Sequence, residues 1–259
     1  VDDEFMQKLE HRDPTAMSLW VKILKSRVET GEPYIMFKDN VNNANPPAYK
    51  KNNLEVSMTN ICSEITLFTD DEHSFICCLS SVNLTKYDEW KNTDLVETAV
   101  YFLDGVLEEF LAKTSGRESL IRAHRSAKKG RAIGLGVLGW HTYLQNERIP
   151  FGSIRATSLT HEIFSDLRTK AEVASRKLAD EYGEPVWCKG TGQRNTHLLA
   201  IAPTVSNSTI AGGVSAGIEP IPANVYTFNS AKGTFIRKNK ALVDYLEEKG
   251  ANTEEVWDQ

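Results

Sequence analysis

The stretch Thr59–Leu84, TNICSEITLFTDDEHSFICCLSSVNL, indicates the fold class of this 259-residue chain. Two strand-like runs, Thr59–Phe68 and Phe75–Leu84, flank a charged turn, TDDEHS. Apolar residues then recur at helical spacing from Thr93 to Leu111, which predicts a long helix with one apolar side. Strand-like runs that alternate with long helices are typical of an α/β fold with mainly parallel strands.

The same alternation continues on both sides of this stretch. Helical spacing predicts helices over 15–30 and 156–182, each followed closely by Gly and then Pro. Short apolar runs predict strands at Tyr34–Asn40 and Leu198–Thr204, the second buried and followed by a turn into a short helix. The pattern therefore predicts an α/β fold along the whole chain.

Composition excludes several classes of protein. Hydrophobic residues make up 41% and charged residues 25% of the chain, which argues against disorder and against a fibrous fold. The formal net charge of −5 argues against a large basic surface, so no nucleic acid partner is expected. Because no apolar run approaches the roughly 18 residues that span a bilayer, no membrane partner is expected either.

The ends and the cysteines indicate the setting. The chain starts VDDEFMQKLE, without an initiator Met or a secretion signal, and closes with a helix-like segment, a Gly stop and a further segment. We expect a piece of a longer chain or one product of a split gene. Four cysteines, of which Cys77 and Cys78 are adjacent, do not form a disulfide framework, so reduced thiols in a cytoplasm-like compartment are expected.

A formal GxGxxG occurs at Gly134–Gly139, but it is a weak sign of a dinucleotide site. That fingerprint requires a preceding hydrophobic strand, and here AKKGRA precedes the glycines. We expect instead a glycine-lined helix start that allows close packing. Lys128, Lys129 and Arg131 are expected on a solvated or anion-facing turn.

No metal site is expected in this chain. The six histidines show neither HxH nor HExxH spacing, and Cys77-Cys78 lacks the CxxC spacing that zinc prefers. Lone histidines of this kind are usually surface or core residues. They are His11, His73, His124, His141, His161 and His197.

The segment Pro203–Ser208, PTVSNS, is a candidate phosphate site. Its hydroxyl and amide side chains stand where a predicted strand ends and a predicted helix begins. The first turn of a helix offers free backbone N–H groups, which suit phosphate. Ordinary helix capping by Ser and Thr would give the same pattern.

The segment Asn60–Glu64 is a candidate reactive site. In an extended backbone, residues i, i+2 and i+4 point to one side, so Asn60, Cys62 and Glu64 would share one space. An amide, a thiol and a carboxylate would then supply a hydrogen-bond partner, a reactive sulfur and a base. Cys77 follows on the next strand-like run and could return to the same region. The alternative is a buried small thiol beside surface polar groups.

Five motifs occur along the chain in this order: NICSEI, CCLSSVNL, GLGVLG, APTVSNS and GIEP. With these motifs in the family's order, the chain resembles the catalytic large chain of class I ribonucleotide reductase, most of all its bacterial and tailed-phage branch. The resemblance implies part of a ten-stranded α/β barrel with a loop that carries a radical cysteine through its centre. It implies reduction of ribonucleoside diphosphates to deoxyribonucleoside diphosphates.

The resemblance also assigns roles. Cys62 matches the cysteine that becomes a thiyl radical and abstracts hydrogen from the ribose 3′ carbon. Glu64 matches the carboxylate that takes the 3′-hydroxyl proton, and Asn60 matches the amide that holds the substrate. Cys77, rather than Cys78, matches one of the two thiols that become a disulfide, because of the C-x-L-S spacing.

Substrate contacts are implied in two places, the turn that carries the thiol and a loop that cradles the diphosphate. The account requires the thiol, carboxylate and amide to meet in a closed cavity that faces this loop. The residues expected to bind the ribonucleoside diphosphate are Asn60, Ile61, Cys62, Ser63, Glu64, Pro203, Thr204, Val205, Ser206, Asn207 and Ser208.

The sequence resembles a partial catalytic barrel domain over 1–259, roughly the middle third of the family's large chain. An N-terminal allosteric part, the partner of Cys77 and a C-terminal radical-relay and redox tail are absent from it. The resemblance implies no cofactor held by this chain, a radical from a metal-containing small subunit, and thioredoxin or glutaredoxin as reductant. We expect the chain to be inactive without the remaining large-subunit segments, and to act in a homodimer in the cytoplasm of a bacterium or a phage-infected host.

Three other functions fit parts of the pattern. A cobalamin-dependent ribonucleotide reductase would share the barrel and a similar cysteine loop. A decayed or structural fragment would keep the fold without activity, although the intact Asn60, Cys62, Glu64 and Cys77 argue against decay. A catalytically inert nucleotide-binding module would use the Pro203–Ser208 turn alone.

Overall fold

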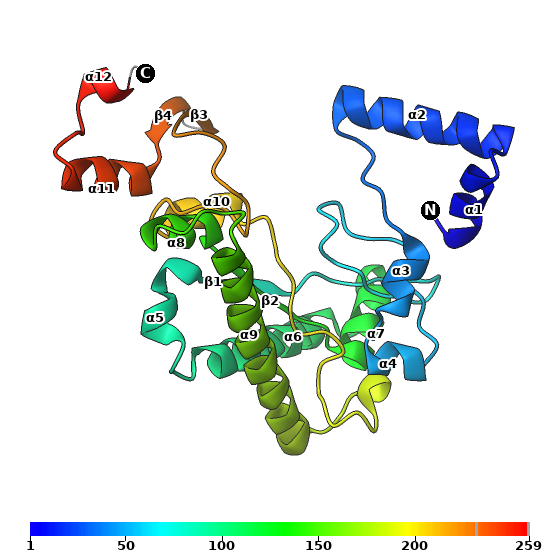
Figure 1. Cartoon of the computed structure of the whole chain (residues 1–259). Coiled ribbons are helices and arrows are strands. Elements are labelled where there is room, and N and C mark those ends of the chain that lie inside the picture. The colour runs from blue at the N-terminus through cyan, green and yellow to red at the C-terminus, as the bar shows by residue number, and fades with distance from the viewer. Residues whose placement is uncertain (231–232, 258–259) are drawn as a thin grey trace. The chain divides into compact units, whose positions relative to one another are not determined.

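The computed structural model describes residues 1–230 and 233–257, and its elements confirm the α/β class (Figure 1). The α-helices are α1 (Asp3–Glu10), α2 (Pro14–Thr30), α3 (Lys38–Asn43), α4 (Pro47–Lys51), α5 (Tyr87–Trp90), α6 (Leu95–Thr114), α7 (Ile121–Gly130), α8 (Trp140–Asn146), α9 (Ile154–Tyr182), α10 (Val205–Ile210), α11 (Lys240–Glu248) and α12 (Glu254–Trp257). The strands are β1 (Leu79–Asn83), β2 (Gly134–Leu138), β3 (Val225–Ser230) and β4 (Gly233–Lys238), and short 3₁₀ turns lie at Leu84–Lys86, Glu118–Leu120 and Val186–Cys188.

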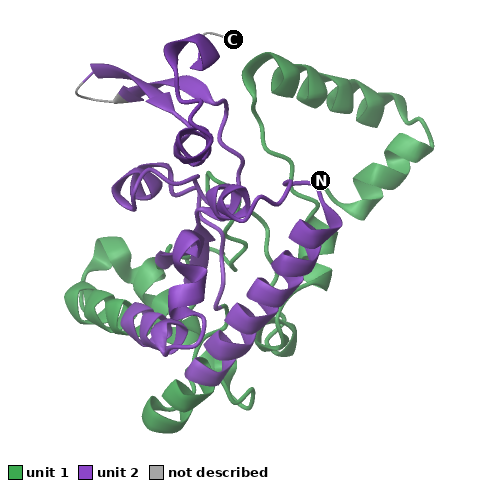
Figure 2. Ribbon diagram, turned by 60° about the vertical axis from the view of Figure 1, so that its left-hand side comes forward, with its two compact units in different colours: residues 1–78, 104–133, 175–197 green, residues 79–103, 134–174, 198–259 purple. Residues whose placement is uncertain are grey.

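The chain divides into two compact units, coloured separately in Figure 2. The first comprises residues 1–78, 104–133 and 175–197, and the second comprises residues 79–103, 134–174 and 198–259. Two of the five boundaries fall within the long helices α6 and α9, so each of these helices contributes residues to both units.

A parallel pair of strands forms the centre of the second unit. β1 pairs with β2 in parallel, and Leu199 adds a single parallel bridge to Leu135 on the other side of β2. A Cβ on Gly136 would lie 2.1 Å from the carbonyl oxygen of Ala200, so only glycine allows this segment to approach β2 so closely. Parallel pairing was predicted from the sequence and is confirmed.

The core of the first unit packs aromatic and aliphatic side chains from separate segments. Tyr49, from α4, is almost fully buried and meets Trp187 edge to face, with ring centroids 6.3 Å apart. Ile65 and Leu67 are buried in the same unit and anchor the chain that follows the Asn60–Glu64 turn.

All three long helices predicted from the sequence are confirmed, with small shifts at their ends, as α2, α6 and α9. Asp13 caps α2 by accepting the Ala16 amide at 2.9 Å, and Gly31 ends this helix at φ +81°. These ends could be predicted because the capping residues are local in sequence.

Two of the predicted strands are wrong, and a third is reduced to one bridge. Within 34–40 no strand forms, because Met36 and Lys38 hydrogen-bond the N-terminal residue Val1 and a helix begins at Lys38. The 59–68 run is irregular, and 198–204 contributes only the bridge at Leu199. Of Phe75–Leu84, only Leu79–Asn83 forms a strand.

The glycine motif also differs from its prediction. Gly134–Leu138 is the fully buried strand β2 and not a helix start, whereas Gly139, at φ +80°, is the N-cap of α8. The GxGxxG therefore lies largely inside a strand rather than after one, which is not the arrangement of a dinucleotide fingerprint.

Within residues 1–230 and 233–257, no helix combines the length and the apolar character that a membrane span needs.

Candidate functional site

Asn60–Glu64 form a closed turn instead of the predicted extended segment. The Asn60 carbonyl accepts the Ser63 amide at 3.0 Å, and the Asn60 amide donates to the Ile65 carbonyl at 3.3 Å. Ser63 stands at φ +68°, a left-handed conformation that bends the chain back. The predicted strand alternation is therefore wrong here, because the Asn60 side chain bonds its own segment, which favours a turn over a strand.

The turn nevertheless brings the amide and the carboxylate together. Asn60 Nδ2 donates to Glu64 Oε2 at 2.7 Å, and Asn60 Oδ1 accepts the Ile65 amide at 3.0 Å. Asn60 and Glu64 are both half-buried. A donor on one carboxylate oxygen fixes the direction of the group, which suits a general base that must reach one substrate hydroxyl.

Cys62 lies at the exposed tip of this turn. Its neighbour Ile61 is 86% exposed, and Cys62 and Ser63 are exposed as well. The expected closed cavity around the thiol is therefore not formed by the part of the chain that the structure describes. The reason is geometric: a turn projects its central side chains outward, whereas a strand would have set Cys62 beside Asn60 and Glu64 on one face.

Two residues of this turn act on the charge of Cys77, the thiol that the sequence predicted to return to it. Partial burial of its sulfur raises the pKa of the Cys77 thiol, and Glu64 and Cys62 raise it further through their charges. Asn60, Cys62, Glu64 and Cys77 belong to the same unit, and Glu64 and Cys62 act on the charge of the Cys77 thiol.

Cys78 has a different environment from Cys77. Cys77 is exposed, whereas Cys78 is buried, and burial raises the pKa of Cys78 to about 11. The charges that act on Cys78 are those of Asp104 and Arg131, not those of Glu64 and Cys62. The two adjacent thiols therefore differ in burial and in the charged groups that act on them.

Behind Cys78 lies a buried ion-pair network. The Asp104 carboxylate accepts from Arg131 Nε and Nη2, each at 2.8 Å, and from Arg194 Nε at 2.9 Å. Asn195 donates to Asp104 at 3.1 Å, and Arg131 also reaches Glu108 at 2.9 Å. Burial would raise the pKa of Asp104, but the hydrogen bonds and charges of Arg131 and Arg194 hold it below its usual value.

Arg131 contradicts one prediction. It was expected on a solvated or anion-facing turn, yet it is only 4% exposed and its guanidinium is bonded within the network. Its backbone is the left-handed C-cap of α7, at φ +44°, which turns the side chain away from the exposed Lys128.

The Pro203–Ser208 segment belongs to the second unit and starts the short helix α10. Thr204 is the N-cap at φ +52°, and its hydroxyl oxygen accepts the Gly217 amide at 2.8 Å instead of capping its own helix. The first intrahelical bond runs from the Ser208 amide to the Thr204 carbonyl at 2.8 Å. The amides at 205–207 precede that bond and have no partner within the helix, as at any helix start.

Among residues 1–230 and 233–257, no group of three or more His, Cys, Asp or Glu side chains is arranged to hold a metal ion. Several histidines instead make structural contacts. His141 accepts the Ile221 amide at 3.2 Å, and His124 pairs with Thr114 at 2.8 Å.

The sequence analysis treated the TDDEHS turn only as a charged connector and did not predict its hydrogen bonds to other side chains. His73 Nδ1 lies 2.9 Å from Asp70 Oδ1, and His73 Nε2 lies 2.8 Å from Lys129 Nζ. The spacing of Asp70 and His73 could have suggested a local hydrogen bond. No sequence pattern pointed to Lys129, because it lies 56 positions later in the chain.

Comparison with known proteins identifies the family. The family described as "Ribonucleotide reductase, barrel domain" matches residues 3–191 and 187–259. A Frog virus 3 protein named as a ribonucleoside-diphosphate reductase large subunit is 44% identical over 245 residues, which are 94% of this chain and 43% of that protein. The vitamin B12-dependent ribonucleoside-diphosphate reductase of Thermoplasma acidophilum is 30% identical over 289 residues, which are 100% of this chain and 36% of that protein.

Among solved structures, the Actinobacillus ureae class Id ribonucleotide reductase alpha subunit matches with a TM-score of 0.93 and 45% identity, over 100% of this chain and 48% of that one. This chain therefore spans less than half the length of these relatives. The match along nearly all of its residues confirms the expected fold family. The chain belongs to the ribonucleotide reductase barrel-domain family.

Proposed function

We propose that this chain carries the thiyl-radical site of a class I ribonucleotide reductase large subunit, which reduces ribonucleoside diphosphates to deoxyribonucleoside diphosphates. One observation supports the proposal above all others. The turn that bears Cys62 also holds Glu64 against Asn60 at 2.7 Å, and the charges of Glu64 and Cys62 both raise the pKa of the Cys77 thiol.

The proposed chemistry gives each of these groups a separate role. The Cys62 sulfur, as a thiyl radical, takes the hydrogen atom from the ribose 3′ carbon, while Glu64 accepts the 3′-hydroxyl proton. The 2′-hydroxyl then leaves as water. Cys77 and a second thiol supply two electrons and two protons and become a disulfide, after which Cys62 returns its hydrogen atom to the 3′ carbon.

Asn60 has an orienting role in this account. Its amide holds one oxygen of Glu64, and its own side-chain oxygen is fixed by the Ile65 amide. A base aimed in advance at the 3′-hydroxyl does not have to reorganise during the reaction, which lowers the barrier. Ile61 and Ser63, on the same turn, are proposed to contact the substrate.

The diphosphate is proposed to bind at Pro203–Ser208. The support is the resemblance of PTVSNS to the family's phosphate loop, together with the exposed side chains of Ser206 and Asn207. Titration calorimetry on this chain with CDP and with cytidine tests this part. We expect CDP to bind measurably more tightly than cytidine, and equal affinities would contradict the assignment.

The remaining partners are also proposed. A thiyl radical must be shielded from solvent. Because Cys62 is exposed here, we propose that segments of the large subunit outside this chain cover it. The radical would come from a metal-containing small subunit and the reducing equivalents from thioredoxin or glutaredoxin, in a homodimeric cytoplasmic enzyme. This chain alone would then be inactive.

The test of the proposal is CDP reduction by this chain together with the remaining large-subunit segments and a small subunit. We expect turnover that Cys62→Ser abolishes, since an oxygen in place of the sulfur cannot form the thiyl radical. Turnover by Cys62→Ser at the wild-type rate would refute the proposal. The cobalamin alternative predicts that turnover requires adenosylcobalamin instead of the small subunit. It is less favoured, because the relatives with higher identity are named as a large subunit and a class Id alpha subunit.

A further inference from the structure

The turn Thr69–Ser74 connects the Glu64 segment to the Cys77 segment. Several internal hydrogen bonds hold this turn in place. The Asp70 amide and the Thr69 hydroxyl both donate to the His73 carbonyl, at 3.0 and 2.8 Å. Asp70 Oδ1 accepts from the Glu72 amide at 2.8 Å and from the His73 amide at 2.7 Å. These bonds reverse the chain, so that Cys77 runs back toward Glu64.

The same turn is fastened to helix α7 at three points. His73 Nε2 lies 2.8 Å from Lys129 Nζ, the Ser74 amide donates to the Arg122 carbonyl at 3.3 Å, and Glu72 pairs with Arg125. Lys129 also lies over the ring of Trp187 at 6.0 Å. Side chains of α7 therefore fix where the turn can lie within the first unit.

The chemistry of Asp70, His73 and Lys129 decides which ring nitrogen of His73 carries the proton. A lysine ammonium group can only donate, so His73 Nε2 must be the acceptor, and Nδ1 then carries the proton that is donated to Asp70. The charged groups that face His73 are Asp70, Lys129 and the Glu72–Arg125 pair. We call Asp70, His73 and Lys129 the His73 relay.

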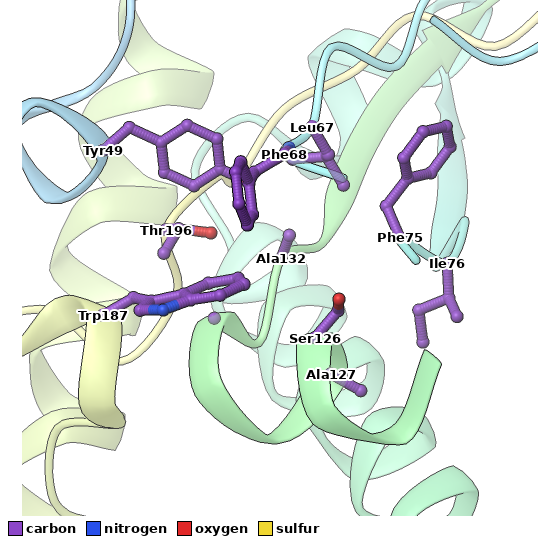
Figure 3. A pocket seen from close by; sticks show the side chains of 11 residues that line it. Tyr49, Leu67, Phe68, Phe75, Ile76, Ser126, Ala127, Ala132, Trp187 and Thr196 are labelled. Carbon is purple, nitrogen blue, oxygen red and sulfur yellow. The ribbon is translucent and has the colours of Figure 1, made fainter. Parts of the chain in front are cut away.

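Packing transmits the position of the turn to the Cys77 segment. Phe68 and Phe75, the residues on either side of the turn, line a cavity of about 10 Å³ together with Ile76 and Trp187 (Figure 3). A space of this size holds no more than about one water molecule. Because close-packed interiors transmit small shifts, a displaced turn moves Phe75 and Ile76, and with them Cys77.

We propose that the His73 relay is a positioning device that sets the Cys77 thiol beside Glu64 and Cys62. Asp70, His73 and Lys129 touch no substrate in this account, and they act through the turn and the segment that follows it. The inference rests on the proposed function, because it explains how the reducing thiol is presented to the radical site.

The test replaces Lys129 by Met in the full 259-residue chain and follows alkylation of Cys77 by iodoacetamide against pH, with each cysteine resolved by fragmentation mass spectrometry. If the relay holds Cys77 in its partly buried position near Glu64, loss of the relay weakens both the burial and the charge effects that raise the Cys77 pKa. We then expect the midpoint of the Cys77 profile to fall by about half a pH unit or more, and alkylation at pH 8 to quicken about threefold. A shift of the same sign is expected for His73→Gln.

Two matched controls separate positioning from general damage. Lys128→Met removes the neighbouring exposed lysine of α7 and should leave the Cys77 profile unchanged. Lys129→Arg keeps a donor for His73 Nε2 and should restore the wild-type profile. The fully buried Cys188 reports unfolding in the same sample, since it is alkylated only when the unit opens.

The relay proposal is overturned if Lys129→Met leaves the Cys77 profile unmoved, if Lys128→Met shifts it equally, or if Cys188 becomes reactive together with Cys77. In the reconstituted reductase, Lys129→Met should lower kcat several-fold and leave KM for CDP unchanged. A different result, full turnover by Cys77→Ser, would contradict the proposed function itself.

Discussion

At the residue scale, the adjacent thiols Cys77 and Cys78 show how neighbours in sequence can have unlike chemistry. Cys77 is exposed and subject to the charges of Glu64 and Cys62, whereas Cys78 is buried and subject to those of Asp104 and Arg131. Thiol–disulfide exchange requires an accessible sulfur that can become a thiolate. The greater exposure of Cys77 is consistent with its proposed role as the reducing thiol, which its C-x-L-S spacing suggested.

This difference predicts opposite effects of two similar substitutions. Cys78→Ala should leave multiple-turnover CDP reduction by the reconstituted enzyme within about twofold of wild type, because the lost sulfur takes no part in exchange. Cys77→Ala should abolish it. Turnover measured with a dithiol reductant decides the matter, and an inactive Cys78→Ala variant that retains the wild-type melting temperature would contradict the assignment.

Asp104 is predicted to matter for stability through its buried charge. Asp104→Asn leaves the guanidinium groups of Arg131 and Arg194 without their shared carboxylate, so we expect a loss of about 3–5 kcal/mol in the free energy of unfolding. Glu108→Gln, which removes the 67% exposed partner of the same Arg131, should cost no more than about 1 kcal/mol. Urea unfolding of both variants tests this, and equal losses would contradict it.

At the element scale, the β2 glycines illustrate what the sequence could and could not predict. GLGVLG was singled out, but local sequence does not reveal that the Leu198–Ala200 segment lies against these residues, and so the strand was interpreted as a helix start. The helices α2, α6 and α9 were predicted because their apolar spacing and caps are local signals. Strands that depend on distant partners were predicted less well.

The candidate site shows the same difference between what local sequence predicts and what distant contacts decide. Asn60, Cys62, Glu64 and Cys77 were proposed from their residue types and order, and the structure joins Asn60 to Glu64 by a hydrogen bond. Their arrangement was not predictable, since the bend at Ser63 and the Asn60–Glu64 hydrogen bond depend on the folded turn. The contact between His73 and Lys129 joins residues from separate elements, for which the sequence carries no spacing signal.

Two glycine substitutions test the packing of the elements. Gly136→Ala places a Cβ 2.1 Å from the Ala200 carbonyl oxygen and should destabilise the chain by about 1–3 kcal/mol or more. Gly105→Ala, in helix α6, meets no atom within 4 Å of its new Cβ and should stabilise the chain by about 0.5–1 kcal/mol. Denaturant midpoints of the two variants should move in opposite directions, and a stabilising Gly136→Ala would contradict the packing described.

At the scale of the whole molecule, we expect the lowered pKa of His197 to make the folded chain less stable in acid. Burial lowers the pKa of His197 from 6.5 to about 4, so the unfolded chain takes up this proton first as the pH falls. The contribution of the neutral imidazole is complete above pH 6.5 and is lost progressively between pH 6.5 and about 4. The free energy of unfolding should therefore fall with pH across this window.

Urea unfolding at several pH values in this range measures the effect. His197→Gln removes the titrating group, so its stability should fall less steeply with pH than that of the wild type. His161→Gln, at an exposed position of α9, provides the control and should keep the wild-type slope. The same slope in all three proteins would show that His197 does not contribute.

The family assignment and the site together make one claim about the whole enzyme, that hydrogen leaves the ribose 3′ carbon for the Cys62 sulfur. The direct measurement compares reduction of CDP with that of CDP deuterated at the 3′ carbon, in the reconstituted enzyme under single-turnover conditions. We predict slower reduction of the deuterated substrate by the wild type and no reduction of either by Cys62→Ser. Reduction of the two substrates by Cys62→Ser at equal, wild-type rates would contradict the account.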